Sequence, residues 1–111
     1  MDLNQEIQDR LEEFTAICDK HKVERLYVFG SALQRPIDKT SSDIDFLVEV
    51  NQPDPIERGE CLMNIWNDLE TFFHCDVDLL TEASLENPVL KENIDRNKVL
   101  LYDGRRKKVL V

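Results

Sequence analysis

Three aspartates with a regular spacing are the residues of this chain best suited to chemistry. One residue separates Asp43 from Asp45 in segment 43–50, where polar and apolar residues alternate. In a strand, this alternation places both carboxylates on one face, where they repel each other unless a cation lies between them. Asp78 lies in a second such segment, 76–81. If the two segments form neighbouring strands, the three carboxylates meet, and such oxygen ligands favour magnesium or manganese.

A glycine and a serine, Gly30 and Ser31, follow segment 23–29, whose β-branched and aromatic residues are typical of a strand. Glycine lets a ligand approach the backbone closely, and serine offers a hydroxyl group and a backbone N–H. A short helix that begins at Ser31 or Ala32 would direct unpaired N–H groups at the same point and favour phosphate. A Gly-Ser pair alone is usually a turn, and an Asp-x-Asp pair alone is usually solvated. Together they predict the phosphate and metal sites that phosphoryl transfer requires.

The elements that must position these residues are predicted from hydrophobic periodicity. Spacings of three and four predict helices over 3–18, from Asp54–Pro55 to Phe73, and from Asn87–Pro88 to about Asn97. Strands are predicted over 23–29, 43–50 and 76–81, and residues 98–102 form either a fourth strand or the end of the last helix. This order predicts an α/β (α+β) fold, with a mixed sheet of three to four strands backed by helices. We expect Trp66, Phe72 and Phe73 in its core, and His21 and His74 at the surface or at the boundary of the core.

The length of the chain and its charge indicate how many domains it forms and which partners it disfavours. A chain of 111 residues is one domain, and we assign it to residues 1–104. The basic run Arg105, Arg106, Lys107 and Lys108 begins a C-terminal segment, 105–111, for which a solvated tail is favoured over a docking patch. The net charge of −9 disfavours direct nucleic-acid binding.

The location of the protein is predicted from what the sequence lacks. No apolar run approaches the ~20 residues that cross a bilayer, and the acidic N-terminus is unlike a signal peptide. Cys18, Cys61 and Cys75 form no C-x-x-C pair, which favours buried thiols over disulfides or a zinc site. We therefore expect a cytoplasmic protein without a membrane anchor.

Three segments together resemble a known family. They read Y-V-F-G-S-A-L from Tyr27, S-D-I-D-F-L-V-E from Ser42 and V-D-L-L-T from Val77. They resemble the signature of the polymerase-beta-like nucleotidyltransferase superfamily, and most closely its minimal nucleotidyltransferase (MNT) branch. The chain's end, from N-P-V-L-K-E-N-I to K-V-L-L-Y, is also similar to that branch, so the resemblance runs to about Tyr102.

One departure from the branch lies between the serine and the first aspartate. Eleven residues, 32–42, separate them, one more than is usual. A loop absorbs an added residue at small cost in free energy, so we expect the site to be kept. The insertion leaves open whether Arg35 or Lys39 contacts phosphate.

The resemblance implies a role for each candidate residue. Gly30 and Ser31 would hold the β- and γ-phosphates of ATP. Asp43 and Asp45 would bind the Mg²⁺ that bridges the triphosphate. Asp78 would join them around a second Mg²⁺ that lowers the pKa of the acceptor hydroxyl, and Asp78 could also serve as the general base for that hydroxyl. Asp76 shares a strand face with Asp78 and is the alternative third ligand; the family pattern favours Asp78.

The acceptor is left open among three alternatives. The favoured alternative is an MNT antitoxin, because members of the branch are this short and lack an appended substrate domain. It would transfer AMP to a tyrosine of a HEPN-type ribonuclease toxin encoded nearby, in a hetero-oligomer or as a homo-oligomer. The second is a nucleotidyltransferase for a small molecule such as an antibiotic. The third is a binding-only antitoxin that occludes its partner.

Overall fold

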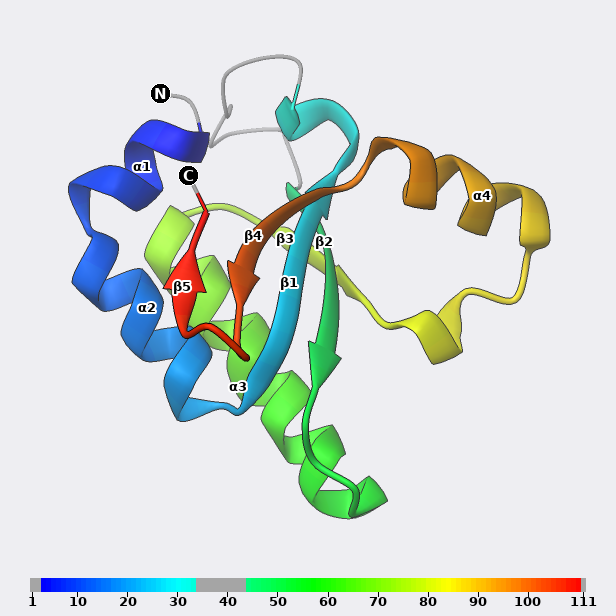
Figure 1. The fold of residues 1–111 in the computed structure, drawn as a ribbon, viewed down its shortest axis with the longest axis horizontal. Coiled ribbons are helices and arrows are strands. Elements are labelled where there is room, and N and C mark those ends of the chain that lie inside the picture. Colours follow the sequence, from blue (N-terminus) through cyan, green and yellow to red (C-terminus); the bar gives the residue numbers. More distant parts are fainter. Residues whose placement is uncertain (1–2, 34–43, 111) are drawn as a thin grey trace.

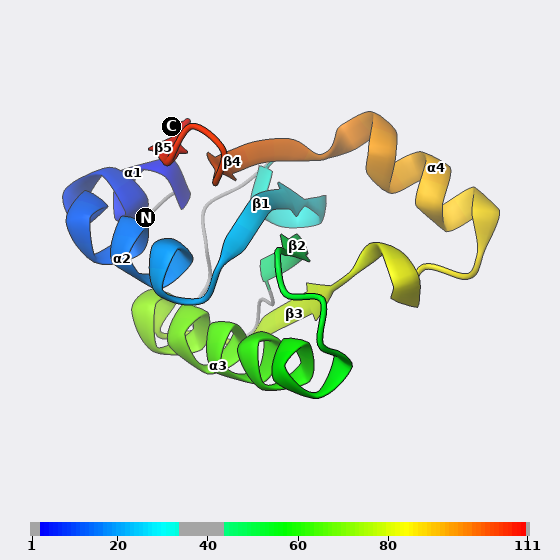
Figure 2. The ribbon, with the colours of Figure 1, turned by 60° about the horizontal axis from the view of Figure 1, so that its bottom comes forward.

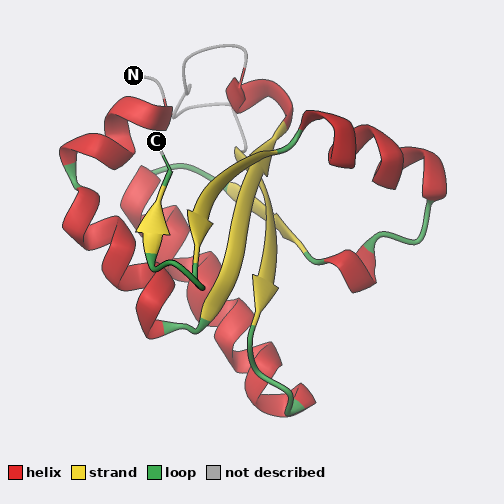
Figure 3. Cartoon of the chain, in the orientation of Figure 1, coloured by secondary structure: helices red, strands yellow, loops and turns green. Residues whose placement is uncertain are grey.

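A five-stranded mixed sheet forms the centre of the protein in this computed structural model, which describes residues 3–33 and 44–110 (Figures 1 and 3). The helices are α1 (Leu3–Asp9), α2 (Leu11–Lys20), α3 (Pro55–Phe73) and α4 (Pro88–Asn97), with 3-10 turns at Gly30–Leu33 and Glu82–Ser84. The strands are β1 (Val23–Phe29), β2 (Ile44–Val50), β3 (Val77–Leu80), β4 (Val99–Asp103) and β5 (Lys108–Val109). They lie in the order β3-β2-β1-β4-β5, and only the β2–β3 pair is parallel. The predicted mixed sheet backed by helices is confirmed, with five strands where three to four were expected.

The two faces of the sheet are covered differently (Figure 2). One face packs against α1, α2 and α3 and forms the main core, in which Phe46 of β2 contacts Phe73 of α3 with ring centroids 5.8 Å apart. On the other face, Leu47 packs with Leu85 and Ile94 in a small second cluster. Helix α4 lies to one side of the sheet and therefore covers this second face only in part (Figure 2).

The predicted N-terminal helix is two helices, so the expectation of one continuous helix was wrong. The chain leaves helical geometry at Arg10, with φ −134° and ψ 48°. The Arg10 guanidinium lies 3.9 Å from the centroid of the Phe72 ring and donates a hydrogen bond to the Phe72 carbonyl. It also forms ion pairs with Glu6 and Glu13. At this break, the Arg10 side chain therefore connects the end of α1 to the end of α3. The residues in this contact lie far apart in the sequence.

Helix α3 begins as predicted. The Asp54 carboxylate accepts hydrogen bonds from the N–H groups of Ile56 and Glu57, and Pro55 is the first helical residue. Phe72 and Phe73 are buried as expected. Trp66 is 40% exposed, so its assignment to the core was wrong. Trp66 lies at the edge of the buried stripe of α3. Helical periodicity alone does not distinguish a residue at this edge from one at the centre of the stripe.

Gly59 is a weak point of α3 that a substitution should correct. A Cβ atom at this position would meet no other atom within 4 Å, and its φ is not in the left-handed region. We expect Gly59→Ala to raise the free energy of unfolding by about 1 kcal/mol, because alanine has the higher helix propensity. Chemical denaturation of both proteins measures the difference; an unchanged or lower midpoint would contradict the structure of this turn.

The C-terminal part of the chain belongs to the sheet. Of the two predictions for residues 98–102, the strand is confirmed, as β4 pairs with β1. The basic run after residue 104 forms a turn and then β5, which pairs with β4 through Tyr102↔Val109 and Asp103↔Lys108. The four basic side chains are exposed, as a solvated segment predicts. The pairing of β5 was not predicted, because strand pairing depends on a partner rather than on local composition.

Buried titratable groups lie in the helical layer. Burial raises the pKa of the Cys18 thiol to about 12, in keeping with the predicted buried thiol, and Cys61 and Cys75 are half-buried. His21 is only 6% exposed and its Nε2 lies 2.6 Å from Asp68 Oδ2, so its expected position at the surface or boundary was wrong. His74 is exposed, as predicted.

Within 3–33 and 44–110, no helix is both long enough and apolar enough to cross a membrane.

Candidate functional site

Gly30 directly follows β1 and lies beside one of the predicted carboxylates. Its φ is +80°, in the left-handed region that favours glycine. A Cβ atom added there would lie 2.6 Å from Oδ2 of Asp45. The register explains this closeness, because Phe29, the residue before Gly30, pairs with Asp45 of β2. Gly30, which is predicted to let a ligand approach the backbone, thus lies beside Asp45, which is predicted to bind metal.

Asp45 and Asp78 are direct neighbours in the sheet. They are register partners in the parallel pair of β2 and β3, whose strands lie about 4.8 Å apart in such ladders. The residues that flank them (Ile44, Phe46, Val77 and Leu79) all point into the main core. Asp45 and Asp78 therefore lie on the opposite face, the one that α4 only partly covers. Asp45 is half-buried and Asp78 is exposed.

The other predicted site residues are placed only in part. Asp43, Arg35 and Lys39 lie outside the described residues. Ser31 is the second residue of the 3-10 turn Gly30–Leu33, but its side chain is also outside the described part. Asp76 is exposed and directly precedes β3, and its carbonyl accepts a hydrogen bond of 3.1 Å from the N–H of Ile44.

The described carboxylates fit a hard divalent cation. Asp45 and Asp78 could supply oxygen ligands from adjacent register positions, and at Gly30 no side chain lies between the backbone and the Asp45 carboxylate. Two carboxylates on one face repel each other unless a cation lies between them, and oxygen ligands of this kind suit Mg²⁺. Over residues 3–33 and 44–110, no three acidic, histidine or cysteine side chains are grouped to hold a metal ion. Asp43, which is predicted to bind metal together with Asp45 and Asp78, lies outside these residues.

A hollow beside Gly30 adds residues that the sequence analysis did not identify. It has a volume of about 320 Å³ and is lined by Gly30 and Leu33 on one side and by Leu90, Asn93 and Asn97 of α4 on the other. The spacing of the two asparagines, one helical turn apart, was the available signal. Periodicity places them on one face of α4, but it does not show that this face meets the end of β1.

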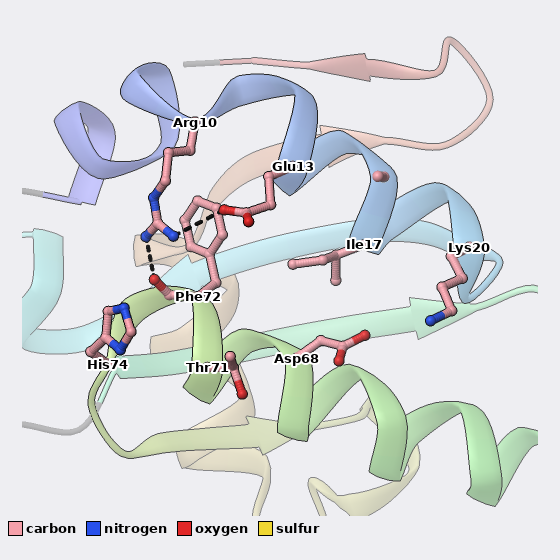
Figure 4. Close-up of a pocket in the computed structure, with 9 residues that line it drawn as sticks. Arg10, Glu13, Ile17, Lys20, Asp68, Thr71, Phe72 and His74 are labelled. Carbon is pink, nitrogen blue, oxygen red and sulfur yellow. Dashed lines mark hydrogen bonds and ion pairs between the residues drawn. The ribbon is translucent and has the colours of Figure 1, made fainter.

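A second hollow lies away from the carboxylates, between α2 and α3 (Figure 4). Its volume is about 480 Å³, and its lining includes Glu13 and Lys20 of α2, Asp68 of α3, and Arg10 and His74, which flank these two helices. Both helices pack on the face of the sheet opposite Asp45 and Asp78. Its larger volume therefore does not make it the site of the predicted chemistry.

Comparison with known proteins points to one family. The family model described as "Polymerase beta, Nucleotidyltransferase" matches residues 12–107. The chain is similar to "Putative protein adenylyltransferase MJ1217" of Methanocaldococcus jannaschii, with 31% identity over 97 residues that cover 86% of this chain and 95% of that protein.

Solved structures show the same fold. One described as a minimal nucleotidyltransferase is 26% identical, with a TM-score of 0.59, and the match covers 89% of this chain and 95% of the other. A crystal structure described as a toxin-antitoxin with AMP-PNP is 25% identical, with a TM-score of 0.58, covering 83% of this chain and 72% of the other. The family-model match over residues 12–107 includes the strands and turn that carry Gly30, Asp45 and Asp78.

Proposed function

This chain belongs to the polymerase-beta nucleotidyltransferase family, and from this premise we propose that it transfers AMP from ATP to a hydroxyl group of a protein. The observation that carries the proposal is the register of Asp45 with Asp78, next to the side-chain-free position Gly30. The similarity to a protein named as an adenylyltransferase of proteins supports a protein acceptor.

In this proposal each predicted site residue has one role in the reaction. Asp43, Asp45 and Asp78 would hold two Mg²⁺ ions, which when bound neutralise the charge of the triphosphate and of the departing pyrophosphate. Gly30 and Ser31 receive the β- and γ-phosphates, because at Gly30 no side chain separates the backbone from Asp45. Asp78 is the more exposed carboxylate and so the one open to an acceptor. It accepts the proton of the hydroxyl group as the oxygen attacks the α-phosphorus and pyrophosphate leaves.

The acceptor in this proposal is a tyrosine of a HEPN-type ribonuclease toxin, and the chain acts as its antitoxin. The similarity to a structure described as a toxin-antitoxin with AMP-PNP supports a toxin as the partner and an adenine nucleotide as the donor. The net charge of −9 also suits a basic partner that itself binds RNA, since opposite charges speed association and favour the correct partner.

Transfer of label tests this proposal. We expect incubation with Mg²⁺, the neighbouring toxin and α-labelled ATP to label a toxin tyrosine, whereas γ-labelled ATP leaves the toxin unlabelled. The label should disappear with Asp45→Ala. A toxin that is neutralised equally well by Asp45→Ala without label would support occlusion instead. Label that appears on an aminoglycoside and not on the toxin would support a small-molecule acceptor.

A further inference from the structure

The hollow between the turn Gly30–Leu33 and α4 is largely apolar. Phe29, Leu33, Leu90 and Ile94 contribute to its lining. Leu33 and Leu90 remain 38% and 47% exposed, so aliphatic surface there is still open to solvent. None of the described residues that line the hollow is charged. Such a lining suits the faces of an uncharged ring and does not suit a phosphate group.

Two amide side chains give this apolar hollow a polar edge. Asn93 and Asn97 lie one turn apart on α4, and Nδ2 of Asn97 donates a hydrogen bond of 2.8 Å to the carbonyl of Asn93. This bond uses one amide proton of Asn97 and leaves Oδ1 as an acceptor. An amide oxygen pairs well with the exocyclic amino group of adenine, and apolar side chains pack on the faces of the ring.

The position of the hollow relates it to the carboxylates. Gly30 belongs to the lining, and the same residue lies against Asp45. A ligand with its phosphates beside Gly30 and Asp45 therefore has an uncharged pocket directly next to it. The volume of about 320 Å³ falls within the range of small-molecule sites.

From these observations we infer that the hollow binds the adenine ring of the donor nucleotide, with Asn97 Oδ1 accepting from the exocyclic amino group. The inference rests on the proposed transfer of AMP and adds a residue that selects the nucleotide. In this arrangement, Leu33 and Leu90 pack on the faces of the adenine ring, and α4 recognises the base.

Filling the hollow tests the location of the base. We expect Leu90→Trp to raise the KM for ATP at least about tenfold with little change in kcat, because the added ring occupies the space of the base. The matched control is Val89→Trp, which introduces the same tryptophan at the preceding residue. Val89 is 67% exposed and does not line the hollow. Inhibition by inorganic triphosphate, which has no base, should be equal in all three proteins.

A second variant tests the polar contact. The wild-type protein should prefer ATP to inosine triphosphate, which lacks the amino group, and Asn97→Ala should reduce this preference by about tenfold. If wild-type protein transfers AMP but neither variant changes KM or preference, the pocket assignment is wrong and the proposed function stands. The assignment also fails if Leu90→Trp weakens inorganic triphosphate as much as ATP. If wild-type protein transfers no nucleotide, both fail.

Discussion

Asp78→Asn should lower the rate of AMP transfer by about a thousandfold or more while leaving the protein folded. Removing a ligand of the catalytic metal withdraws several kcal/mol of transition-state stabilisation. Asparagine keeps the shape of the side chain, and Asp78 is exposed on the face opposite the main core, so no core packing is lost. Removal of one of two neighbouring like charges should keep the melting temperature equal or raise it. Steady-state transfer assays and thermal denaturation measure the two effects.

The control for Asp78→Asn is Asp76→Asn. Asp76 is also exposed and lies just before the same strand, so the change in charge and size is identical. Activity close to that of the wild type is expected for this variant. A loss of transfer in Asp76→Asn with full activity in Asp78→Asn would move the third ligand to Asp76.

Gly30→Ala should reduce transfer by about a hundredfold or more, because one methyl group disturbs both the backbone and a carboxylate. Alanine is strained at φ +80°, and its Cβ would lie 2.6 Å from Asp45 Oδ2, so the turn or the carboxylate must move. A displacement of about 1 Å at a reacting centre can cost about a hundredfold in rate. The strain should also lower the free energy of unfolding by roughly 1–3 kcal/mol.

Gly59→Ala is the matched control for this second prediction. It makes the same chemical change at a glycine with ordinary helical geometry and open space around it. It should stabilise the protein and leave transfer unchanged. Full activity in Gly30→Ala would show that the close approach of Gly30 to Asp45 has no role in the reaction.

Features that depend on local sequence were predicted well. The Asp54–Pro55 and Asn87–Pro88 pairs mark helix starts because the capping side chain and the fixed proline act within the first turn. Alternation of polar and apolar residues places Asp45 and Asp78 on one face of the sheet, and their pairing is confirmed by the register of β2 and β3. The catalytic roles of these residues stay predictions.

Features that depend on distant contacts were missed. The helix break at Arg10 is held by the carbonyl of Phe72, and His21 is buried because it meets Asp68. The hollow beside Gly30 exists because α4 returns to the end of β1. In each case the decisive partner is more than 40 positions away in sequence. Local propensity and periodicity carry no information about such contacts.

The most direct measurement is the position of a bound Mn²⁺ ion in crystals grown with a non-hydrolysable ATP analogue, located by its anomalous scattering. If the account is correct, an ion lies about 2.1 Å from carboxylate oxygens of both Asp45 and Asp78, beside Gly30. An ion that contacts neither carboxylate, or a nucleotide bound with no ion between these two residues, would contradict it.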